Sequence, residues 1–288
     1  MTETIDKNRI QAVPLGSPLY PKEWTELKDA PPVVYAYGDL SLLAQRKLVI
    51  VGSRRTPANA LKLGSSIAKE LSESMTIITG TADGGDSAAI EGGLNGSGKV
   101  VCVLAGGFAA LPQGNLALLK QVAQKGLLLS PYEYDTPVRT FSYGYRNKLL
   151  AALGEAVLVL GAGEKSGALV TADYAFRYKK PVFALPYPPA SASGAGCNAL
   201  IKRGGYLTEA AQDVAQKLGL ALCQRRTSVE LTAEEARTLA ALKENPDGHI
   251  SEIAREAGLS PFKAMAVLSA LEVKGLAVAL GGNRYAPV

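Results

Sequence analysis

Short apolar runs alternate with helical patterns through the middle of the chain. Runs of three to five apolar residues, rich in β-branched types, are typical of strands buried on both faces of a sheet. Such runs predict strands at 48–51, 76–79, 100–104, 127–129, 156–160 and 182–185. Between them, apolar residues recur at helical spacing near 57–73, 84–94, 114–125, 145–153 and 169–179. Strands that alternate with helices predict an α/β fold with a doubly wound, largely parallel sheet.

Two segments flank this core domain, which we place at 48–219. Residues 1–47 form a lead-in that we expect to pack on the core domain, with one short strand from Pro32 to Tyr37. Residues 220–230 show no clear period and are typical of a linker. Beyond the linker, Thr232 and Glu235 mark a helix start, and two more helical patterns and a terminal hairpin follow. Three helices and a hairpin predict a small winged-helix domain at 231–288.

A first candidate site follows the first strand of the core domain. Gly52-Ser53 ends that strand in a tight turn, Arg54 and Arg55 come next, and Pro57 stands where a helix begins. Free backbone N–H groups and the positive end of a helix make such a turn a natural anion site, and this sequence adds two guanidinium groups. Phosphate binding and a plain turn with two solvated arginines explain these residues equally well.

Further turns of small residues follow other strands, at the sheet edge where doubly wound folds bind their ligands. In the turn after the second strand, three glycines permit close approach of a ligand, and Asp83 and Asp86 are candidate helix caps. Between Tyr143 and Lys148, two aromatic residues lie beside two cations, which suits single-stranded nucleic acid but also an ordinary surface helix. Together these segments predict a polyanionic ligand. The candidate binding residues are Gly52, Ser53, Arg54, Arg55, Gly80, Arg139, Tyr143, Arg146, Asn147, Lys148, Lys165, Ser166, Gly167, Asn198 and Lys202.

The charge of the chain is unevenly divided. The net charge is +5, yet the tail from Thr227 on has six basic and eight acidic residues, so it carries −2 and the remainder +7. A helix that reads DNA is expected to be basic on its docking face, whereas the third helix of the tail has few polar side chains. We therefore assign the anionic ligand to the core domain and favour a protein-contact or regulatory role for the tail.

Composition narrows the remaining classes of function. The three cysteines are widely spaced, which argues for a reducing compartment. No apolar run approaches the roughly 20 residues that span a bilayer, so we expect a cytoplasmic protein without a membrane segment. His249 is the only histidine, which argues against a metal site or a histidine-based catalytic triad. We expect no cofactor, no metal and no catalytic residue.

Five motifs, taken in order along the chain, resemble the DNA-processing protein DprA (Smf) family. They are Gly-Ser-Arg, the glycine-rich turn with Asp, Arg-Asn-Lys, Ser-Gly-Ala-Leu-Val-Thr-Ala and Gly-Cys-Asn-Ala-Leu-Ile. The resemblance implies a Rossmann-like domain, often followed by a winged helix, in a dimeric and non-enzymatic protein. Such proteins bind single-stranded DNA, protect it during natural transformation and load the RecA recombinase on it. The family's DNA contacts correspond to Ser53, Arg54, Tyr143 and the run from Arg146 to Lys148.

The sequence departs from the family pattern in the second turn. Gly85 replaces an isoleucine, Asp83 adds an acid, Ile90 stands where a histidine is usual, and Glu164 lies near the expected DNA edge. These departures leave two alternatives open. The first is a regulatory protein or antitoxin of a phage-defence module that acts through a protein partner such as a toxin. The second is a nucleotide-binding sensor, although the Pro-Gly-Gly-x-Gly-Thr motif of related nucleotide-cleaving enzymes is missing.

Overall fold

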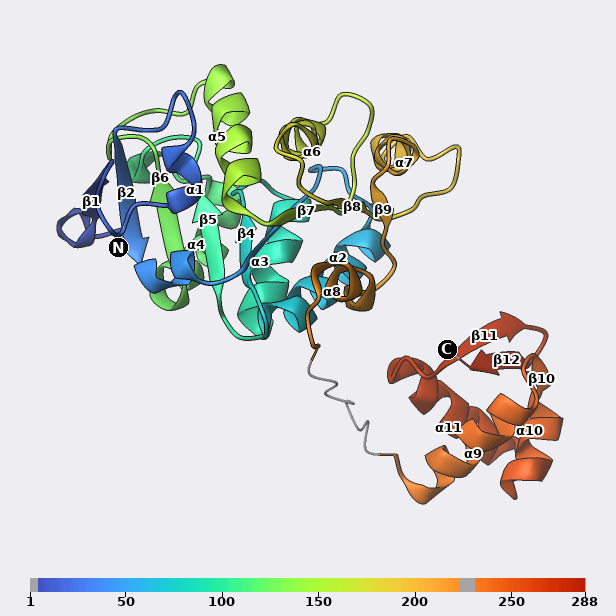
Figure 1. Cartoon of the computed structure of the whole chain (residues 1–288). Coiled ribbons are helices and arrows are strands. Elements are labelled where there is room, and N and C mark those ends of the chain that lie inside the picture. The colour runs from blue at the N-terminus through green and yellow to red at the C-terminus, as the bar shows by residue number, and fades with distance from the viewer. Residues whose placement is uncertain (1–4, 223–230, 288) are drawn as a thin grey trace. The chain divides into compact units, whose positions relative to one another are not determined.

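The chain forms two compact units, one within residues 1–223 and one within 224–288. The computed structural model describes residues 5–222 and 231–287 (Figure 1). The predicted linker at 220–230 therefore falls largely outside the described residues. Its first part packs on the first unit, because Leu220 and Leu222 lie against the cluster formed by helix α2 (Ala58–Ser72) and helix α8 (Ala211–Leu218).

A nine-stranded sheet forms the middle layer of the first unit, in the order β1-β2-β6-β5-β4-β3-β7-β8-β9. The pairs β1–β2 and β2–β6 are antiparallel, and the other neighbours are parallel. The predicted α/β fold with a largely parallel sheet is therefore confirmed. The strands are β1 (Gln11–Pro14), β2 (Val33–Gly38), β3 (Lys47–Val51), β4 (Thr76–Thr79), β5 (Val100–Val103), β6 (Leu127–Ser130), β7 (Ala156–Val159), β8 (Val182–Ala184) and β9 (Tyr206–Leu207).

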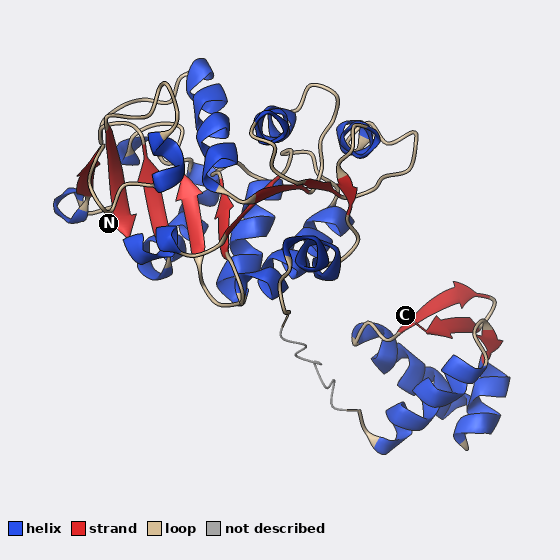
Figure 2. Cartoon of the chain, viewed as in Figure 1, coloured by secondary structure: helices blue, strands red, loops and turns tan. Residues whose placement is uncertain are grey.

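Helices cover both faces of this sheet (Figure 2). Alternate residues of β3 show why: Val49 and Val51 belong to one apolar cluster, whereas Leu48 and Ile50 belong to the other. The cluster with Val49 also holds residues of α1, α5, α6 and α7, while α2, α3, α4 and α8 pack on the opposite face. The helices not yet bounded are α1 (Lys22–Thr25), α3 (Gly85–Asn95), α4 (Leu116–Lys125), α5 (Thr140–Leu153), α6 (Gly167–Arg177) and α7 (Ala195–Lys202). Short 3-10 helices cover Lys7–Arg9, Leu40–Ala44, Phe108–Ala110 and Gln113–Asn115.

The lead-in packs on the sheet and on α5. Trp24 is fully buried, and its indole Nε1 donates a hydrogen bond of 2.9 Å to the carbonyl oxygen of Leu149 in α5. The hydroxyl of Tyr20 donates to the carbonyl of Pro31 over 2.7 Å. These bonds give the polar ends of two large buried side chains a partner, as burial requires.

The second unit has the predicted winged-helix architecture. Helices α9 (Ala233–Glu244), α10 (Ile250–Ala257) and α11 (Pro261–Val273) pack around one apolar cluster. Strands β10 (Gly248–His249), β11 (Ala277–Gly281) and β12 (Arg284–Pro287) form a sheet in the order β10-β12-β11. Thr232 and Glu235 cap α9 reciprocally, as the sequence predicts, with hydrogen bonds of 2.7 and 3.2 Å. Over the described parts of both units, no helix is both long enough and apolar enough to span a membrane.

Candidate nucleic-acid interface

A groove of about 330 Å³ opens at the carboxyl ends of β3 and β7, where the sequence places the candidate ligand. Four segments line it: the turn after β3, the turn after β4 with the start of α3, the N-terminal half of α5, and the turn before α6 with the first turns of that helix. Its lining residues are Val51, Gly52, Ser53, Arg54, Arg55, Ala82, Asp86, Tyr143, Arg146, Asn147, Lys165, Ser166, Gly167, Ala168 and Thr171. Ten of the fifteen predicted binding residues line this groove, namely Gly52, Ser53, Arg54, Arg55, Tyr143, Arg146, Asn147, Lys165, Ser166 and Gly167.

Two strand-end turns meet backbone to backbone beneath the groove. A Cβ atom on Gly85 would lie 2.2 Å from the Cα of Gly52, so neither turn has room for a side chain there. Gly84 has a φ of +85°, and a Cβ on it would lie 2.5 Å from the carbonyl oxygen of Ser53. Gly84 and Gly85 must be glycines because a side chain would not fit at either position, and Gly84 must be one also because of its positive φ. This contact fixes the position of the turn that holds Arg54 and Arg55.

The groove has three exposed cations. Arg54, Arg55 and Lys165 are exposed, and no ion pair to any of them occurs within residues 5–222 and 231–287. The Oγ of Ser53 accepts the N–H of Arg55 over 3.1 Å, which holds that turn in shape. Cations without a protein partner remain available for a mobile anion. Glu164, the acid that the sequence places near the DNA edge, does not line the groove.

Helix α6 directs its N-terminus into the same groove. The side chain of its N-cap residue, Ser166, accepts the N–H of Ala168 over 3.3 Å. The side-chain amide of Asn147 donates to the carbonyl oxygen of Gly167 over 3.0 Å and so ties the first turn of α6 to α5. Asn147 is buried, so it acts on the groove by holding the Lys165–Gly167 turn in place.

Helix α5 presents an aromatic surface to the groove. Tyr143 is 39% exposed and lines the groove, and Phe141, on the same helix, is 66% exposed. Tyr145 is turned elsewhere, because its hydroxyl donates to the carbonyl of Asp29 over 2.6 Å and its ring packs beside Tyr132. Burial raises the pKa of the Tyr145 hydroxyl. Of the two tyrosines considered for base stacking, the structure leaves Tyr143 open.

Arg146 forms a buried ion pair. Its Nη1 lies 3.3 Å from Oδ2 of Asp86, and both side chains are about 95% buried, with 6% and 5% exposure. Gly80 makes this possible, because a Cβ there would lie 1.3 Å from the guanidinium nitrogen. Burial raises the pKa of the Asp86 carboxyl, and the charge of Arg146 opposes that rise. The sequence assigns Arg146 to the ligand, whereas the structure gives its charge to Asp86.

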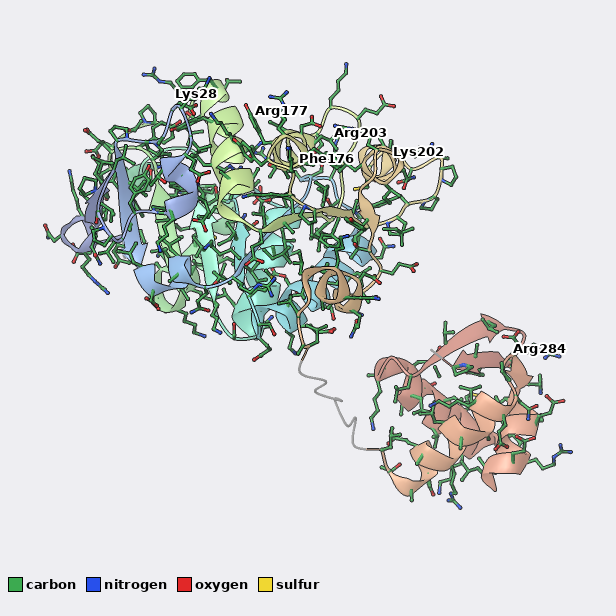
Figure 3. The ribbon with its side chains drawn as sticks, viewed as in Figure 1. Lys28, Phe176, Arg177, Lys202, Arg203 and Arg284 are labelled. Atoms are coloured by element: carbon green, nitrogen blue, oxygen red, sulfur yellow. The ribbon has the colours of Figure 1, made fainter. Side chains whose placement is uncertain are left out.

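The other five candidates do not line the groove. Lys148 pairs with Asp29 of the lead-in. Asn198 bonds both backbone groups of Tyr187, accepting its N–H at 3.0 Å and donating to its carbonyl at 2.9 Å. Lys202 lies in the last turn of α7 (Figure 3). Arg139 lies at the start of α5 and lines a separate cavity of about 590 Å³ beside Tyr134. Gly80 lies beneath the groove, against the Arg146–Asp86 pair.

Two buried polar atoms in the groove lining lack a hydrogen-bond partner in the described part of the chain, Nε of Arg146 and Oγ1 of Thr171. Buried polar atoms are normally paired, so each is a candidate contact for a bound ligand. Thr171 belongs to the Ser-Gly-Ala-Leu-Val-Thr-Ala motif but is not among the predicted binding residues. Sequence reasoning also missed the pairing of Asp86 with a residue sixty positions away. No group of three or more His, Cys, Asp or Glu residues that would suit a metal ion is found in the described residues.

Comparison with known proteins identifies the two units. Residues 11–219 match the family model for DNA recombination-mediator protein A, and residues 224–283 match the model for the DprA winged helix domain. The DNA processing protein DprA of Bacillus subtilis is 32% identical over 212 residues, which cover 73% of this chain and 71% of the relative.

Two solved structures share the fold of the first unit. DNA processing protein A from Streptococcus pneumoniae superposes with a TM-score of 0.70 at 29% identity, covering 74% of this chain and 75% of that one. A structure of DNA processing protein A from Helicobacter pylori, described as giving insight into its single-stranded DNA binding mode, superposes with a TM-score of 0.66 at 30% identity. It covers 73% of this chain and 95% of that one. The chain therefore belongs to the DprA family of DNA-processing proteins.

Proposed function

We propose that this protein binds single-stranded DNA in the groove at the carboxyl ends of β3 and β7. The observation that supports this most is the placement of Arg54, Arg55 and Lys165 around one groove, each exposed and without an acidic partner in the described residues. Phosphates would contact these cations, the Ser53 hydroxyl and the N-terminus of α6. The net charge of +7 outside the tail agrees with a polyanionic ligand.

Base stacking would occur on the surface of α5. Tyr143 lies beside the cations, and an aromatic ring stacks on any base, which favours binding without strong sequence preference. A second cavity of about 150 Å³ shares Arg54, Ala82 and Tyr143 with the groove and continues along Gly106 and Val138. An extended strand that followed both would keep its backbone near Arg54 and its bases near Tyr143.

The relatives support a role in recombination. The H. pylori protein is described as a single-stranded DNA binder, and the family model names a recombination mediator. By this likeness we propose that the chain protects single-stranded DNA and assists loading of the RecA recombinase, as a homodimer and without enzymatic activity. Cys102 and Cys197 are buried free thiols, which agrees with the reducing cytoplasm as its compartment.

Titration with labelled oligonucleotides tests the proposal. At two salt concentrations, single strands should bind more tightly than duplexes of the same length, and the logarithm of affinity should fall with the logarithm of salt by about 0.7 per neutralised phosphate. The variant Arg54→Ala should weaken binding, whereas Lys202→Ala, which also removes an exposed cation, should not. Equal affinities for all three proteins would reject the groove as the DNA site.

Two observations bear on the alternatives. The acidic tail favours a regulatory role through a protein partner, such as an antitoxin, and co-purification of a partner together with negligible oligonucleotide affinity would establish that role. The turn after β3 has the features of a phosphate-binding turn, so it would also suit the phosphates of a free nucleotide. Calorimetry with a panel of nucleotides would distinguish a sensor from a strand binder, because a sensor would bind one nucleotide more tightly than any oligonucleotide.

A further inference from the structure

Helix α11 of the winged-helix unit is apolar on its exposed side as well as on its buried side. Ala264, Val267, Leu268 and Leu271 face the core of the unit. The exposed side presents Phe262, Met265, Ala266, Ser269 and Val273. At about 100° per residue, these five positions fall within an arc of roughly 100°. Phe262 is 84% exposed and Val273 is 90% exposed.

The neighbouring helix α10 shows the ordinary arrangement. Its exposed positions are Ser251, Glu252, Arg255 and Glu256, all polar or charged. Large apolar side chains that are exposed along one face of a helix are uncommon on a monomer and indicate an interaction surface. We call the exposed side of α11, formed by Phe262, Met265, Ala266, Ser269 and Val273, the α11 stripe. Figure 1 shows the place of α11 within the second unit.

The charges around the α11 stripe do not suit DNA. Lys263, at the start of the helix, pairs with Glu234, and Lys274, just after its end, pairs with Glu235. Helices that read DNA contact bases through Arg, Lys, Asn or Gln side chains, and the stripe holds none. Residues 231–288 carry six basic and seven acidic residues, so this part of the chain has no excess of positive charge. An apolar protein surface therefore fits the stripe better than a phosphate backbone.

Four of the five residues of the α11 stripe are symmetrically spaced, and the fifth, Met265, has the partly buried Ala270 as its counterpart. Phe262, Ala266, Ser269 and Val273 are separated by four, three and four positions, so the order is the same in both directions. When two such helices pack antiparallel across a two-fold axis between residues 267 and 268, Phe262 of one opposes Val273 of the other. Ala266 then opposes Ser269, and these small residues let the helices approach closely. A two-fold pair needs this self-complementarity, whereas a different partner protein does not.

We propose that the α11 stripe is a self-association surface that pairs two copies of the winged-helix unit antiparallel across a two-fold axis. The pairing involves no like charges, because the stripe is uncharged and the lysines at its two ends have acidic partners within their own unit. One face of a 13-residue helix buries little area, so the contact is weak and depends on concentration. This inference does not rest on DNA binding by the first unit.

Sedimentation of the full chain over a wide concentration range tests the pairing. Phe262→Glu and Val273→Lys each place a charge on the stripe and should each weaken self-association about tenfold or more. Both variants should fold, because the residues are exposed and an acid near the N-terminus and a base near the C-terminus of a helix are favourable. Leu63→Glu, which changes an exposed leucine of α2 in the first unit, is the matched control and should associate like the wild type.

A mixture of the two variants gives the most specific result. In a mixed pair, the carboxylate introduced by Phe262→Glu in one copy would oppose the ammonium group introduced by Val273→Lys in the other, while the second contact keeps Phe262 against Val273. The mixture should therefore regain most of the association that each variant loses alone. Association of either variant at the wild-type level, or a mixture no stronger than the single variants, would overturn the proposal. Oligonucleotide affinity of both variants should equal that of the wild type, which separates this test from that of the DNA site.

Discussion

Substitution of Gly80 by alanine probes the buried pair beneath the groove. A Cβ at this position would lie 1.3 Å from Nη1 of Arg146 and 2.4 Å from Oδ2 of Asp86. Since no side chain tolerates such distances, the guanidinium must move, and we expect its 3.3 Å contact with Asp86 to be lost. Both side chains are about 95% buried, so water from the groove replaces only part of the lost contact.

The size of the effect follows from that burial. Removing one partner of a buried ion pair lowers the free energy of unfolding by about 3–5 kcal/mol. For a unit of roughly 220 residues, each kcal/mol corresponds to about 2–4 °C in Tm, so Gly80→Ala should lower the Tm of the first unit by roughly 6–20 °C. Arg146→Met should have a similar effect, because it also leaves the Asp86 carboxylate buried without its cation.

Gly144→Ala provides the matched control. Gly144 lies inside α5, two residues before Arg146, and a Cβ there meets no atom within 4 Å. Alanine is better than glycine in a helix interior, so this variant should raise the free energy of unfolding by about 0.5–1 kcal/mol. The same change from glycine to alanine should thus lower the free energy of unfolding at Gly80 and raise it at Gly144.

The measurement is the melting of the full chain by calorimetry, with the transition of the first unit followed separately. In Gly80→Ala the pKa of Asp86 in the folded state should rise further. A carboxyl group whose pKa is raised in the folded state destabilises the fold at high pH and no longer does so once it is protonated at low pH. The difference in stability between Gly80→Ala and the wild type should therefore shrink as pH falls from about 7 to about 4. A Gly80→Ala protein that melts within about 2 °C of the wild type at neutral pH would refute this account of the buried pair.

Three further predictions concern single sites. Arg54→Ala and Lys165→Ala should each reduce the salt dependence of single-strand affinity by about 0.7, seen as a shallower slope in a salt titration; an unchanged slope would remove that cation from the phosphate track. Tyr143→Ala should weaken oligonucleotide binding by about 1–3 kcal/mol in a fluorescence titration while Tyr143→Phe retains it, and equal losses in both would point to the hydroxyl instead of the ring. The hydrogen bond from Lys274 and the N–H of Thr232 hold the pKa of Glu235 below its usual value, so the winged-helix unit should lose stability as pH falls through that lowered pKa. Glu235→Gln should flatten this acid dependence in circular dichroism melts, and an unaltered pH profile would argue against it.

The sequence predicts the sheet well because its strands are short runs of β-branched and other apolar residues. Strand β4 occupies the predicted 76–79, and β3 begins one residue before the predicted 48. Helix α5 begins at Thr140, five residues before the predicted start. The prediction fell short because a glycine such as Gly144 usually indicates the end of a helix, whereas here it lies inside one. The short elements β1, α1, β9 and α8 escape prediction, since segments of eight residues or fewer give no measurable period.

The sequence predicts which turns form the candidate site, but it does not predict which side chains are already bonded to other residues of the protein. Arg54, Arg55 and Lys165 follow strand ends, so the fold class alone brings them to one edge. Arg146 and Lys148 look equally available in the sequence, but their partners Asp86 and Asp29 lie 60 and 119 positions away in the chain. Asn198 looks available too, yet it is bonded to the backbone of Tyr187, 11 positions away. Ile90, a departure from the family pattern, is fully buried in the core, where its apolar side chain is favourable.

Photo-crosslinking of a single-stranded oligonucleotide that carries 5-bromouracil tests the central claim most directly. Irradiation of its complex with the full chain, followed by mass spectrometry of the linked peptides, locates the bases on the protein. We predict crosslinks on the α5 segment that contains Tyr143 and a large loss of crosslinking in Arg54→Ala. Crosslinks confined to residues 231–287, with none on α5, would contradict the assignment of DNA to the groove.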